Sequence, residues 1–478
     1  MDRRERVLIV TGRLAEAVVR QTASQVETRA RVDIEVHVLP ITVAALMHTT
    51  WVERKLEWSP DWQFDRVLLP GYCQGETAAL SQRYGVPFER GPKDILDLPE
   101  FFGLGKRKPA DLTRYDIEIL AEINHAPRLT LDQILSLAEH YRQSGADLID
   151  VGCIPGERWN GVSGTVRALR EGGFRVSIDS FDPQEVRDAV EAGAELVLSA
   201  NLTNIDWAVE LPVEWVLIPD ETRSLDSLQP TIDAMRSAGR TFRIDPILDP
   251  VGVGFTAAIE RYAEARRRWP DIPVMMGIGN VTELAEADTA GMNLLLAGLC
   301  GELGITSVLT TEVANWCRTA VREFDIARRI VRSALEQETI AKHLDSSLVM
   351  LRDPKLREYG QAPLDSLAAQ LKDPNYRIFA ERGELHVMNR DGYWRGTDPF
   401  ELLDQMASAG QELSASHAFY LGYEMSKALT AITLGKQYQQ DEALRWGLAT
   451  RQEASALERR HQTQKSQRRL ETSPEESP

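Results

Sequence analysis

The chain has 478 residues, of which 43% are hydrophobic and 27% are charged, and this composition is typical of a globular protein. Its net charge of −17 at pH 7 argues against a nucleic-acid or anionic-membrane partner, because neutralising phosphates requires an excess of Lys and Arg. No run approaches the ~20 apolar residues that a membrane-spanning helix needs. The length allows roughly two to four domains.

The cysteines give the expected cellular compartment. Cys73, Cys153, Cys300 and Cys317 are scattered without the spacing of a metal site, so we expect no bound metal and reduced thiols, as in the cytoplasm. Residues 1–6 lead directly into a strand-like run, and we expect no signal peptide. These features predict a cytoplasmic protein.

The first predicted domain covers residues 1–105. Strand-like runs alternate there with helix-like segments, and a parallel sheet with helices follows from that order. The strand-like runs are 7–10, 34–39 and 66–69. The segment is therefore predicted to form a small Rossmann-like α/β domain.

The second predicted domain covers residues 115–335. Roughly eight strand–helix units over some 220 residues match the size of a (β/α)₈ TIM barrel. The strands are predicted to end near Ile119, Val151, Ile178, Leu198, Leu217, Ile247, Met276 and Leu309. An open doubly wound sheet is the structural alternative.

The chain changes character after the barrel. Residues 340–450 are predicted to form an α+β extension, with a hairpin that turns at Gly383 and a helix over 417–448. The two hairpin strands are predicted at 376–380 and 385–389. Residues 452–478 are polar and charged and are predicted to form a disordered tail.

Three apolar runs of the barrel segment each stop at a carboxylate. The acids are Asp150, Asp179 and Asp249. The carboxyl ends of barrel strands carry the active site, so we expect these side chains on one face. A carboxylate accepts two parallel hydrogen bonds and suits a planar ligand with adjacent N–H donors. Capping the following helix or pairing with a nearby Arg is the alternative role for each of them.

These motifs resemble those of a known family. Residues 145–152 resemble the second-strand motif of dihydropteroate synthases and other pterin-binding barrels. Residues 176–180 are similar to the third-strand motif of that family, and 248–255 to its Asp-Pro-Gly-rich sixth-strand end. The resemblance implies a TIM barrel of the pterin-binding type in which Asp179 and Asp249 contact the pterin ring.

The resemblance also concerns four further side chains. Asn124 stands where the family has an Asn closing the first strand, and Asn201 is a shifted counterpart of its fourth-strand Asn; with Asp150 they would complete the pterin site. Asn280 resembles the Asn with which pterin-dependent methyltransferases bind the reduced pterin near N5, with a helix N-cap as the alternative. His125 is predicted to act as an acid or base at the barrel mouth, with a surface histidine as the alternative.

Two departures from the family concern cations. Dihydropteroate synthases carry a Ser-Arg-Lys after the seventh strand and an Arg-x-His at the eighth, and these groups hold the pterin and the leaving pyrophosphate. Residues 275–282 contain no Lys, and 308–312 contain no Arg-x-His. A departing pyrophosphate would lose its electrostatic stabilisation, which argues against ordinary folate synthesis by that route.

The layout of three domains resembles dihydropteroate-synthase-related proteins of methanogens and methylotrophic bacteria. That resemblance implies a link to tetrahydromethanopterin, a folate analogue that carries one-carbon units. We therefore predict a pterin-binding transferase in the biosynthesis or metabolism of a one-carbon carrier, with a reduced pterin as substrate or bound cofactor. A pterin-dependent methyl or one-carbon transferase and a non-catalytic pterin-binding subunit are the alternatives. A homodimer or a pathway-enzyme partner is left open.

Overall fold

The computed structural model describes residues 3–105, 110–221, 223–410 and 413–453. It divides into two compact units, each described separately below. One unit comprises residues 1–114 with 333–344, and the other comprises 115–332 with 345–478. None of the helices within the described ranges combines the length and the hydropathy needed to cross a bilayer.

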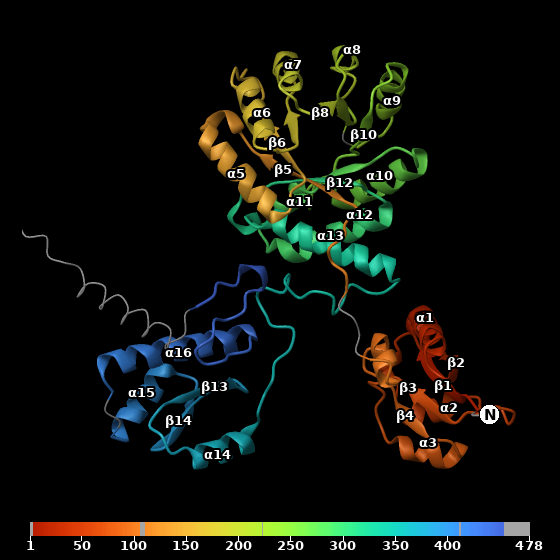
Figure 1. Ribbon diagram of the computed structural model, residues 1–478, viewed down its shortest axis with the longest axis vertical. Helices are drawn as coiled ribbons and strands as arrows, with labels where there is room; N and C mark the ends of the chain where they lie inside the picture. Colours follow the sequence, from red (N-terminus) through yellow and green to blue (C-terminus); the bar gives the residue numbers. More distant parts are fainter. Residues whose placement is uncertain (1–2, 106–109, 222, 411–412, 454–478) are drawn as a thin grey trace, which may run out of the picture. The chain divides into compact units, whose positions relative to one another are not determined.

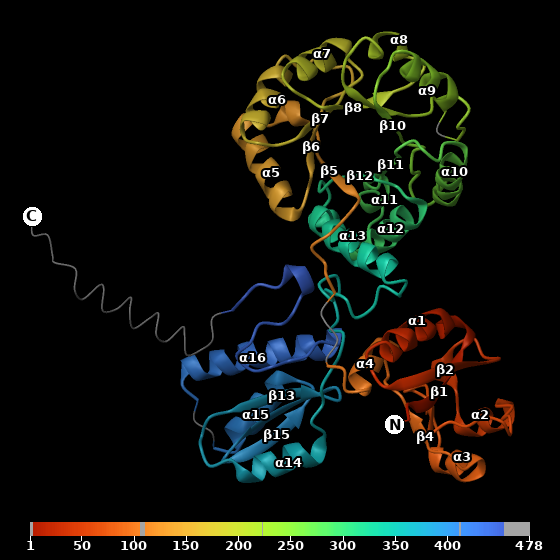
Figure 2. The same cartoon turned by 45° about the vertical axis from the view of Figure 1, so that its right-hand side comes forward.

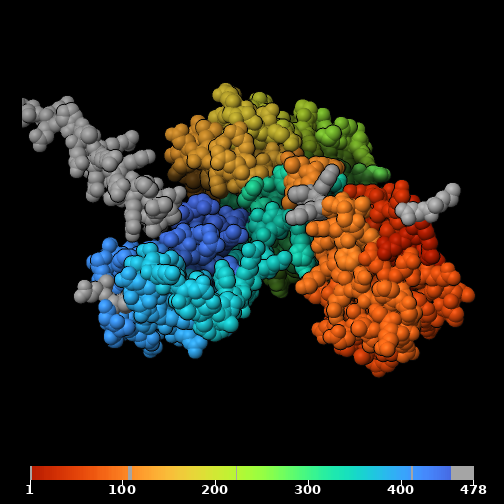
Figure 3. Space-filling view, turned by 60° about the horizontal axis from the view of Figure 1, so that its bottom comes forward, coloured from red at the N-terminus to blue at the C-terminus, as the bar shows by residue number. Residues whose placement is uncertain are grey.

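The N-terminal unit is built on a parallel sheet, and Figure 3 shows its residues 3–105 in red and orange. Within the described residues the sheet has four strands in the order β2-β1-β3-β4, and its central strand β1 is buried at its last six positions. The elements are β1 (Glu5–Gly12), α1 (Glu16–Glu27), β2 (Val32–Leu39), α2 (Thr49–Lys55), β3 (Arg66–Leu69), α3 (Thr77–Tyr84), β4 (Phe88–Arg90) and α4 (Leu98–Phe101). The predicted Rossmann-like domain is confirmed.

The central part of the chain is a (β/α)₈ barrel, as predicted. In the described residues eight parallel strands follow the order β10-β9-β8-β7-β6-β5-β12-β11, and a bridge between Ile244 and Val274 joins the two end strands. Its strands are β5 (Glu118–Ile123), β6 (Leu148–Gly152), β7 (Val176–Asp179), β8 (Leu196–Ala200), β9 (Glu214–Leu217), β10 (Phe242–Ile244), β11 (Met275–Gly277) and β12 (Ser307–Thr310). Figure 2 shows the helices arranged as an outer ring around these strands.

The helices of the ring follow the strands in chain order (Figure 1). They are α5 (Leu131–Ser144), α6 (Val162–Glu171), α7 (Pro183–Glu191), α8 (Ile205–Ala208), α9 (Leu228–Ser237), α10 (Phe255–Arg268), α11 (Gly279–Thr282), α12 (Thr289–Leu303) and α13 (Ala320–Glu336). Several are fixed by local signals. A capping box between Thr130 and Gln133 begins α5, and Gly145, in the left-handed conformation, ends it.

Alternate residues of each barrel strand face the surrounding helices and the barrel interior. In β5, Ile119, Ala121 and Ile123 belong to the core between strands and helices, whereas Leu120 belongs to an apolar layer inside the barrel. That interior layer contains Leu120, Leu148, Leu196, Leu198, Val216 and Met275. Because side chains alternate along a strand, Glu122 faces the interior as well. The strand continues to Ile123, so its predicted end near Ile119 is wrong.

A ring of ion pairs closes the barrel below this apolar layer, at the amino ends of the strands. Arg243 donates to Glu118 at 3.0 Å and to Glu214 at 2.9 Å. Arg175 pairs with the other oxygen of Glu118 at 2.5 Å. Arg243, Glu118 and Glu214 are at least partly buried, and each has an opposite charge beside it, as burial requires.

The sixth strand ends earlier than the sequence predicted. β10 stops at Ile244, not near Ile247, because Pro246 has no N–H for the sheet and Ile247 adopts a left-handed φ of 68°. The Asp245 carboxylate accepts a hydrogen bond from the Ile247 N–H at 2.8 Å and holds this turn. The acid at the end of β10 is therefore Asp245, and Asp249 lies in the loop beyond it.

The C-terminal extension has its own antiparallel sheet. In residues 345–410 and 413–453 it comprises β13 (Arg377–Glu381), β14 (Glu384–Asn389), β15 (Gly392–Gly396), α14 (Gln361–Gln370), α15 (Pro399–Ser408) and α16 (Ala415–Leu434). The predicted hairpin is confirmed as β13 and β14. The predicted helix over 417–448 is too long, because Gly435 adopts a left-handed φ of 68° and ends α16. Residues after 453, where the tail was predicted, lie outside the described residues.

A buried arginine ties α13 to the amino-terminal end of the barrel. The Arg328 side chain is fully buried, and its Nη2 donates to Asp325 and to the Gly145 carbonyl, both at 2.8 Å. Its Nη1 pairs with Asp147 at 2.5 Å, and its guanidinium lies 3.5 Å from the centre of the Tyr115 ring. Removing this cation would take the ion-pair partner from Asp147 and one of three arginines from Asp325.

We therefore expect Arg328→Met to lower the free energy of unfolding of the barrel by about 3–5 kcal/mol, the usual cost of breaking a buried ion pair from one side. Urea unfolding of the full chain measures it. Arg322→Met is the matched control: Arg322 lies on the same helix and pairs with Asp325 at 3.0 Å, but its side chain is 47% exposed. That control should lose less than about 1 kcal/mol. Equal losses in the two variants would contradict the structural role of Arg328.

Candidate ligand site at the barrel mouth

The carboxyl end of the barrel gathers acids from three adjacent strands. Glu122 of β5 lies opposite Asp150 of β6, and Asp150 lies opposite Ser177 of β7. Asp179 follows two residues later on β7, where it faces Gly152. We call Glu122, Asp150 and Asp179 the carboxyl cluster. The parallel register brings these acids together at positions that face the barrel interior.

Asp150 is the most deeply buried member of the carboxyl cluster. Its side chain is 0% exposed, and Oδ1 accepts a hydrogen bond from the Ser177 hydroxyl at 2.6 Å. Oδ2 has no partner among the described residues. Burial, together with the neighbouring Asp179 and Glu122, raises the pKa of Asp150 well above its usual range. A buried carboxyl oxygen without a partner calls for a proton or for a donor from a ligand.

The other two acids are half-buried and reach the mouth. Burial raises the pKa of Asp179 to about 6. Burial also raises the pKa of Glu122 to about 7, an effect that Asp179 and Glu283 reinforce and a hydrogen bond from Asn124 opposes. The Asn124 amide nitrogen donates to Glu122 Oε1 at 3.3 Å. Within the described residues no Lys or Arg is paired with any member of the cluster. The mouth therefore has an excess of negative charge.

The acids of the loop after β10 are, by contrast, already satisfied. Asp245 accepts hydrogen bonds from the Tyr262 hydroxyl at 2.5 Å and from the Ile247 N–H, while burial raises its pKa to about 6. Asp249 Oδ2 forms an ion pair with Arg261 at 2.7 Å. Arg261 also donates to the Ile247 carbonyl at 2.8 Å and so fixes the loop. Asp249 thus differs from the cluster, because it has a cation as its partner.

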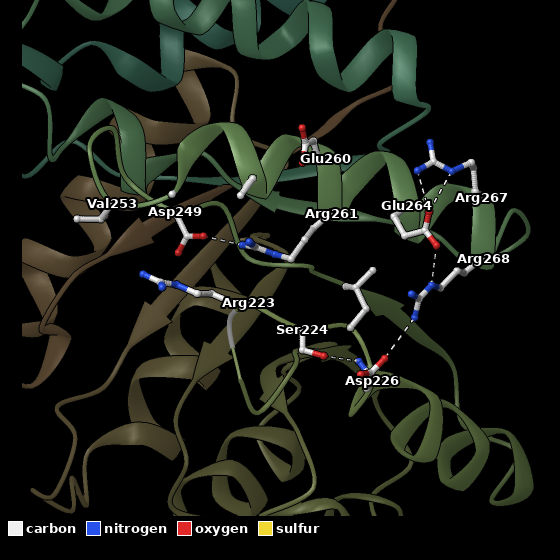
Figure 4. Close-up of a pocket in the computed structure, with 13 residues that line it drawn as sticks. Arg223, Ser224, Asp226, Asp249, Val253, Glu260, Arg261, Glu264, Arg267 and Arg268 are labelled. Carbon is white, nitrogen blue, oxygen red and sulfur yellow. Dashed lines mark hydrogen bonds and ion pairs between the residues drawn. The ribbon is translucent and has the colours of Figure 1, made fainter.

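A cavity of about 720 Å³ lies on the flank of the barrel, between the loop after β9 on one side and α10 with the loop before it on the other (Figure 4). It is lined by Arg223, Ser224, Leu225, Asp226, Asp249, Val253, Gly254, Ala257, Glu260, Arg261, Glu264, Arg267 and Arg268. Most charges here are paired: Arg267 and Arg268 contact Glu264 at 2.7 and 2.8 Å. The cavity excludes the carboxyl cluster. Because its charges largely cancel, it is the weaker candidate for recognising a polar ring.

Two of the predicted amide residues make local contacts. Asn201 Oδ1 accepts hydrogen bonds from the N–H and the hydroxyl of Thr203, at 2.9 and 2.6 Å, which occupies it within the turn after β8. Asn280 is exposed in α11, and its Nδ2 donates to the Leu248 carbonyl at 2.9 Å. Asn280 does not cap that helix, since Ile278 occupies the N-cap position. It instead connects α11 to the loop after β10.

The remaining predicted residues divide between the mouth and the surface. Asn124 lies at the carboxyl cluster through its bond to Glu122. His125, the next residue, is exposed, with a left-handed φ of 50°. The structure therefore brings Asn124, Asp150 and Asp179 together, and leaves His125 on the surface.

Glu122 is the site residue that the sequence interpretation missed. It lies two positions before Asn124 on the same strand, and a period of two places both side chains on the same face. Thr311, directly after β12, adds a buried hydroxyl without a partner among the described residues. In the same described ranges no three His, Cys, Asp or Glu side chains are grouped so that they could hold a metal ion.

Comparison with known families decides the class of the barrel. Residues 124–219 match the family model described as pterin binding enzyme. Over these residues the barrel is similar to pterin-binding enzymes. The resemblance to dihydropteroate synthases and other pterin-binding barrels is thereby confirmed. Residues 5–93 match a family of unknown function, DUF6513, and residues 363–441 match the family PterinBD-DUF4346.

One relative aligns with nearly the whole chain. The "Uncharacterized protein MJ0107" of Methanocaldococcus jannaschii is 24% identical over 91% of this chain and 98% of its own length. Solved structures similar to this chain include the 7,8-dihydropteroate synthase of Vibrio fischeri ES114, at 20% identity, 47% of this chain, 95% of that chain and a TM-score of 0.37. The Yersinia pestis enzyme with a pterine-sulfa conjugate is similar at 19% identity, 47% of this chain, 96% of that chain and a TM-score of 0.37.

The raised pKa of Asp150 makes a prediction about stability. The folded protein keeps a proton on Asp150 that the unfolded chain releases above pH ~4, so this group favours folding at low pH and loses that contribution as the pH rises towards its folded pKa. Asp150→Asn has no proton to lose and keeps the acceptor for Ser177. Relative to the wild type, the variant should therefore gain more than about 1 kcal/mol of unfolding free energy between pH 5 and pH 8.

Urea unfolding of both proteins at the two pH values measures this gain, and Asp182→Asn provides the control. Asp182 caps α7 and pairs with Arg158 at 2.8 Å. Burial alone would raise the pKa of Asp182, but these bonds outweigh it and lower the pKa. Its titration lies below pH 5, so the stability difference from wild type should be the same at pH 5 and pH 8. A pH-independent difference for Asp150→Asn as well would show that Asp150 is ordinarily ionised.

Proposed function

We propose that this chain is a pterin-dependent transferase in the biosynthesis or metabolism of a one-carbon carrier, either tetrahydromethanopterin or a folate-like pterin. One observation carries the proposal: a barrel similar to pterin-binding enzymes has a fully buried Asp150 whose Oδ2 lacks a partner, beside Asp179 at the mouth. A small-molecule pterin is the partner that would supply the missing hydrogen bonds.

The chemistry of the ring matches the chemistry of the mouth. One edge of a pterin carries a ring N–H beside an amino group, and a carboxylate accepts two such parallel hydrogen bonds. Asp179, which is ionised near neutral pH, is proposed to take this edge, with Asp150 and Asn124 completing the contacts. Asn201 and Asp249 are proposed as outer contacts, because each already has a partner within the protein.

The missing cations favour a transfer that does not displace pyrophosphate. The residues that follow β11 and β12, 278–282 and 311–313, include neither Lys nor Arg, so no basic side chain there would stabilise the leaving group. Asn280 lies after β11 and uses its amide nitrogen on the loop after β10. Its amide oxygen is proposed to face the ring nitrogen that carries the one-carbon unit. Transfer of a methyl or other one-carbon unit is therefore the reaction we favour.

Binding is the first test. We expect Asp179→Ala to weaken the binding of a 7,8-dihydropterin by on the order of 100-fold or more, because two hydrogen bonds to a charged group contribute about 1.5–3 kcal/mol each. Asp249→Ala should weaken it less, since Arg261 already neutralises that carboxylate. Calorimetry with the full chain measures both effects.

Asp226→Ala is the control for that experiment. Asp226 lines the flank cavity and its side chain is 88% exposed, so its loss should leave pterin binding unchanged. If Asp226→Ala or Asp249→Ala reduced the affinity as much as Asp179→Ala, the ligand would occupy the flank cavity rather than the mouth. If the folded wild type bound no pterin at all, the proposed function would be wrong.

Catalysis is the second test. We expect Asn280→Ala to lower the rate of transfer from a methylated reduced pterin to an acceptor by on the order of 100-fold, the typical cost of losing one polar group that stabilises a transition state. Pterin affinity should change little, because Asn280 is exposed and lies outside the carboxyl cluster. If the wild type binds pterin and catalyses no transfer, the protein is a pterin-binding subunit and not an enzyme.

A further inference from the structure

Glu122 has no role in the family resemblance, yet it occupies the centre of the mouth. It lies directly opposite Asp150 in the parallel register, and it is the next interior-facing residue of β5 after Leu120. Its carboxyl group lies over the backbone of Gly152, where a side-chain carbon would come within 2.8 Å of Oε1. The absence of a side chain at Gly152 therefore leaves the space that Glu122 occupies.

Among the described residues, the ionisable groups that face Glu122 are acids. Asp150 faces it from β6, Asp179 from β7 and Glu283 from the segment after α11. From α5, the Tyr141 hydroxyl also faces it. On its own strand Asn124 supplies one neutral hydrogen bond, at 3.3 Å. Four carboxyl groups thus share one mouth, and none of the described Lys or Arg side chains is paired with Glu122 or Asp150.

A ligand that covers this mouth favours protonation of one of its carboxyl groups. It removes water, which solvates charged carboxylates better than neutral ones, while its donors keep Asp179 ionised. Glu122 is the group that then takes up a proton, because its pKa of about 7 already leaves it half-protonated at neutral pH. Binding of a ring should therefore shift Glu122 to its protonated form.

We propose that Glu122 is a further ligand-binding residue of this site, and that it binds the pterin as a neutral carboxyl whose O–H is donated to an acceptor atom of the ring. One proton passes from the solvent to a Glu122 oxygen when the ring binds, and it returns when the ring leaves. The mouth then presents an acceptor, Asp179, and a donor, Glu122, from neighbouring parts of the same cluster. This inference rests on the proposed pterin binding. It adds that Glu122 takes up a proton when the pterin binds.

The sign of the pH dependence follows from this assignment. Above pH 7 Asp179 is already ionised, so the ionisation of Glu122 governs the affinity. The wild type should bind a 7,8-dihydropterin on the order of tenfold more weakly at pH 8.5 than at pH 7, because only the protonated fraction of Glu122 can donate. At pH 7 binding should take up about half a proton per ligand.

Glu122→Gln separates this role from a merely structural one. Glutamine has the shape of the protonated carboxyl and keeps an N–H donor without titrating. The variant should bind the dihydropterin as tightly as the wild type at pH 7 within about twofold, keep that affinity at pH 8.5, and take up no proton at Glu122. Calorimetry of the full chain in two buffers with different ionisation enthalpies gives the affinity and the proton count together.

The comparison uses the same ligand for both proteins, so proton changes on the ring itself cancel. Glu191→Gln, an exposed acid at the end of α7, is the control and should behave like the wild type. If wild type and Glu122→Gln show the same pH dependence and proton count, or if the wild type releases protons at Glu122, the inference is wrong while pterin binding stands. If the wild type binds no dihydropterin at either pH, the proposed function fails and this inference with it.

Discussion

Buried charges are paired with opposite charges at one end of the barrel and not at the other. At the amino ends of its strands, Arg243 and Arg175 neutralise Glu118 and Glu214, and an apolar layer separates this ring from the mouth. At the carboxyl ends the carboxyl cluster has no basic partner within the described residues. Buried carboxylates without cations are unfavourable for a free protein. The mouth is therefore the part of the barrel whose energetics a ligand or a proton must complete.

The loop after β10 shows how the same fold uses a cation where rigidity is needed. Arg261 holds Asp249 and the Ile247 carbonyl, and the Tyr262 hydroxyl holds Asp245, so this loop is fixed from α10 before any ligand arrives. Asn280 extends that support to α11 through the Leu248 carbonyl. A rigid wall beside an unsatisfied carboxyl cluster is the arrangement that a preorganised binding site requires.

Much of this could be predicted from the sequence, for identifiable reasons. Apolar runs that alternate with helical segments predicted the barrel, and the acids at the ends of β6 and β7 predicted the mouth, because strand ends meet in space. Glu122 was missed because its significance depends on register, which sets it opposite Asp150. The position of Asp249 was misjudged because the left-handed turn at Ile247 is held by the Asp245 carboxylate and by Arg261 of α10, and a short apolar run does not reveal it.

The most direct test is a crystal structure of the full chain with a bound 7,8-dihydropterin. Recognition by the carboxyl cluster predicts electron density for the ring at the mouth, with its N–H edge within hydrogen-bond distance of Asp179 and a polar atom of the ring within hydrogen-bond distance of Asp150 Oδ2, the oxygen that has no partner among the described residues. Density for the ring in the flank cavity beside Arg223 and Arg261, with Asp150 Oδ2 still unpaired, would contradict it.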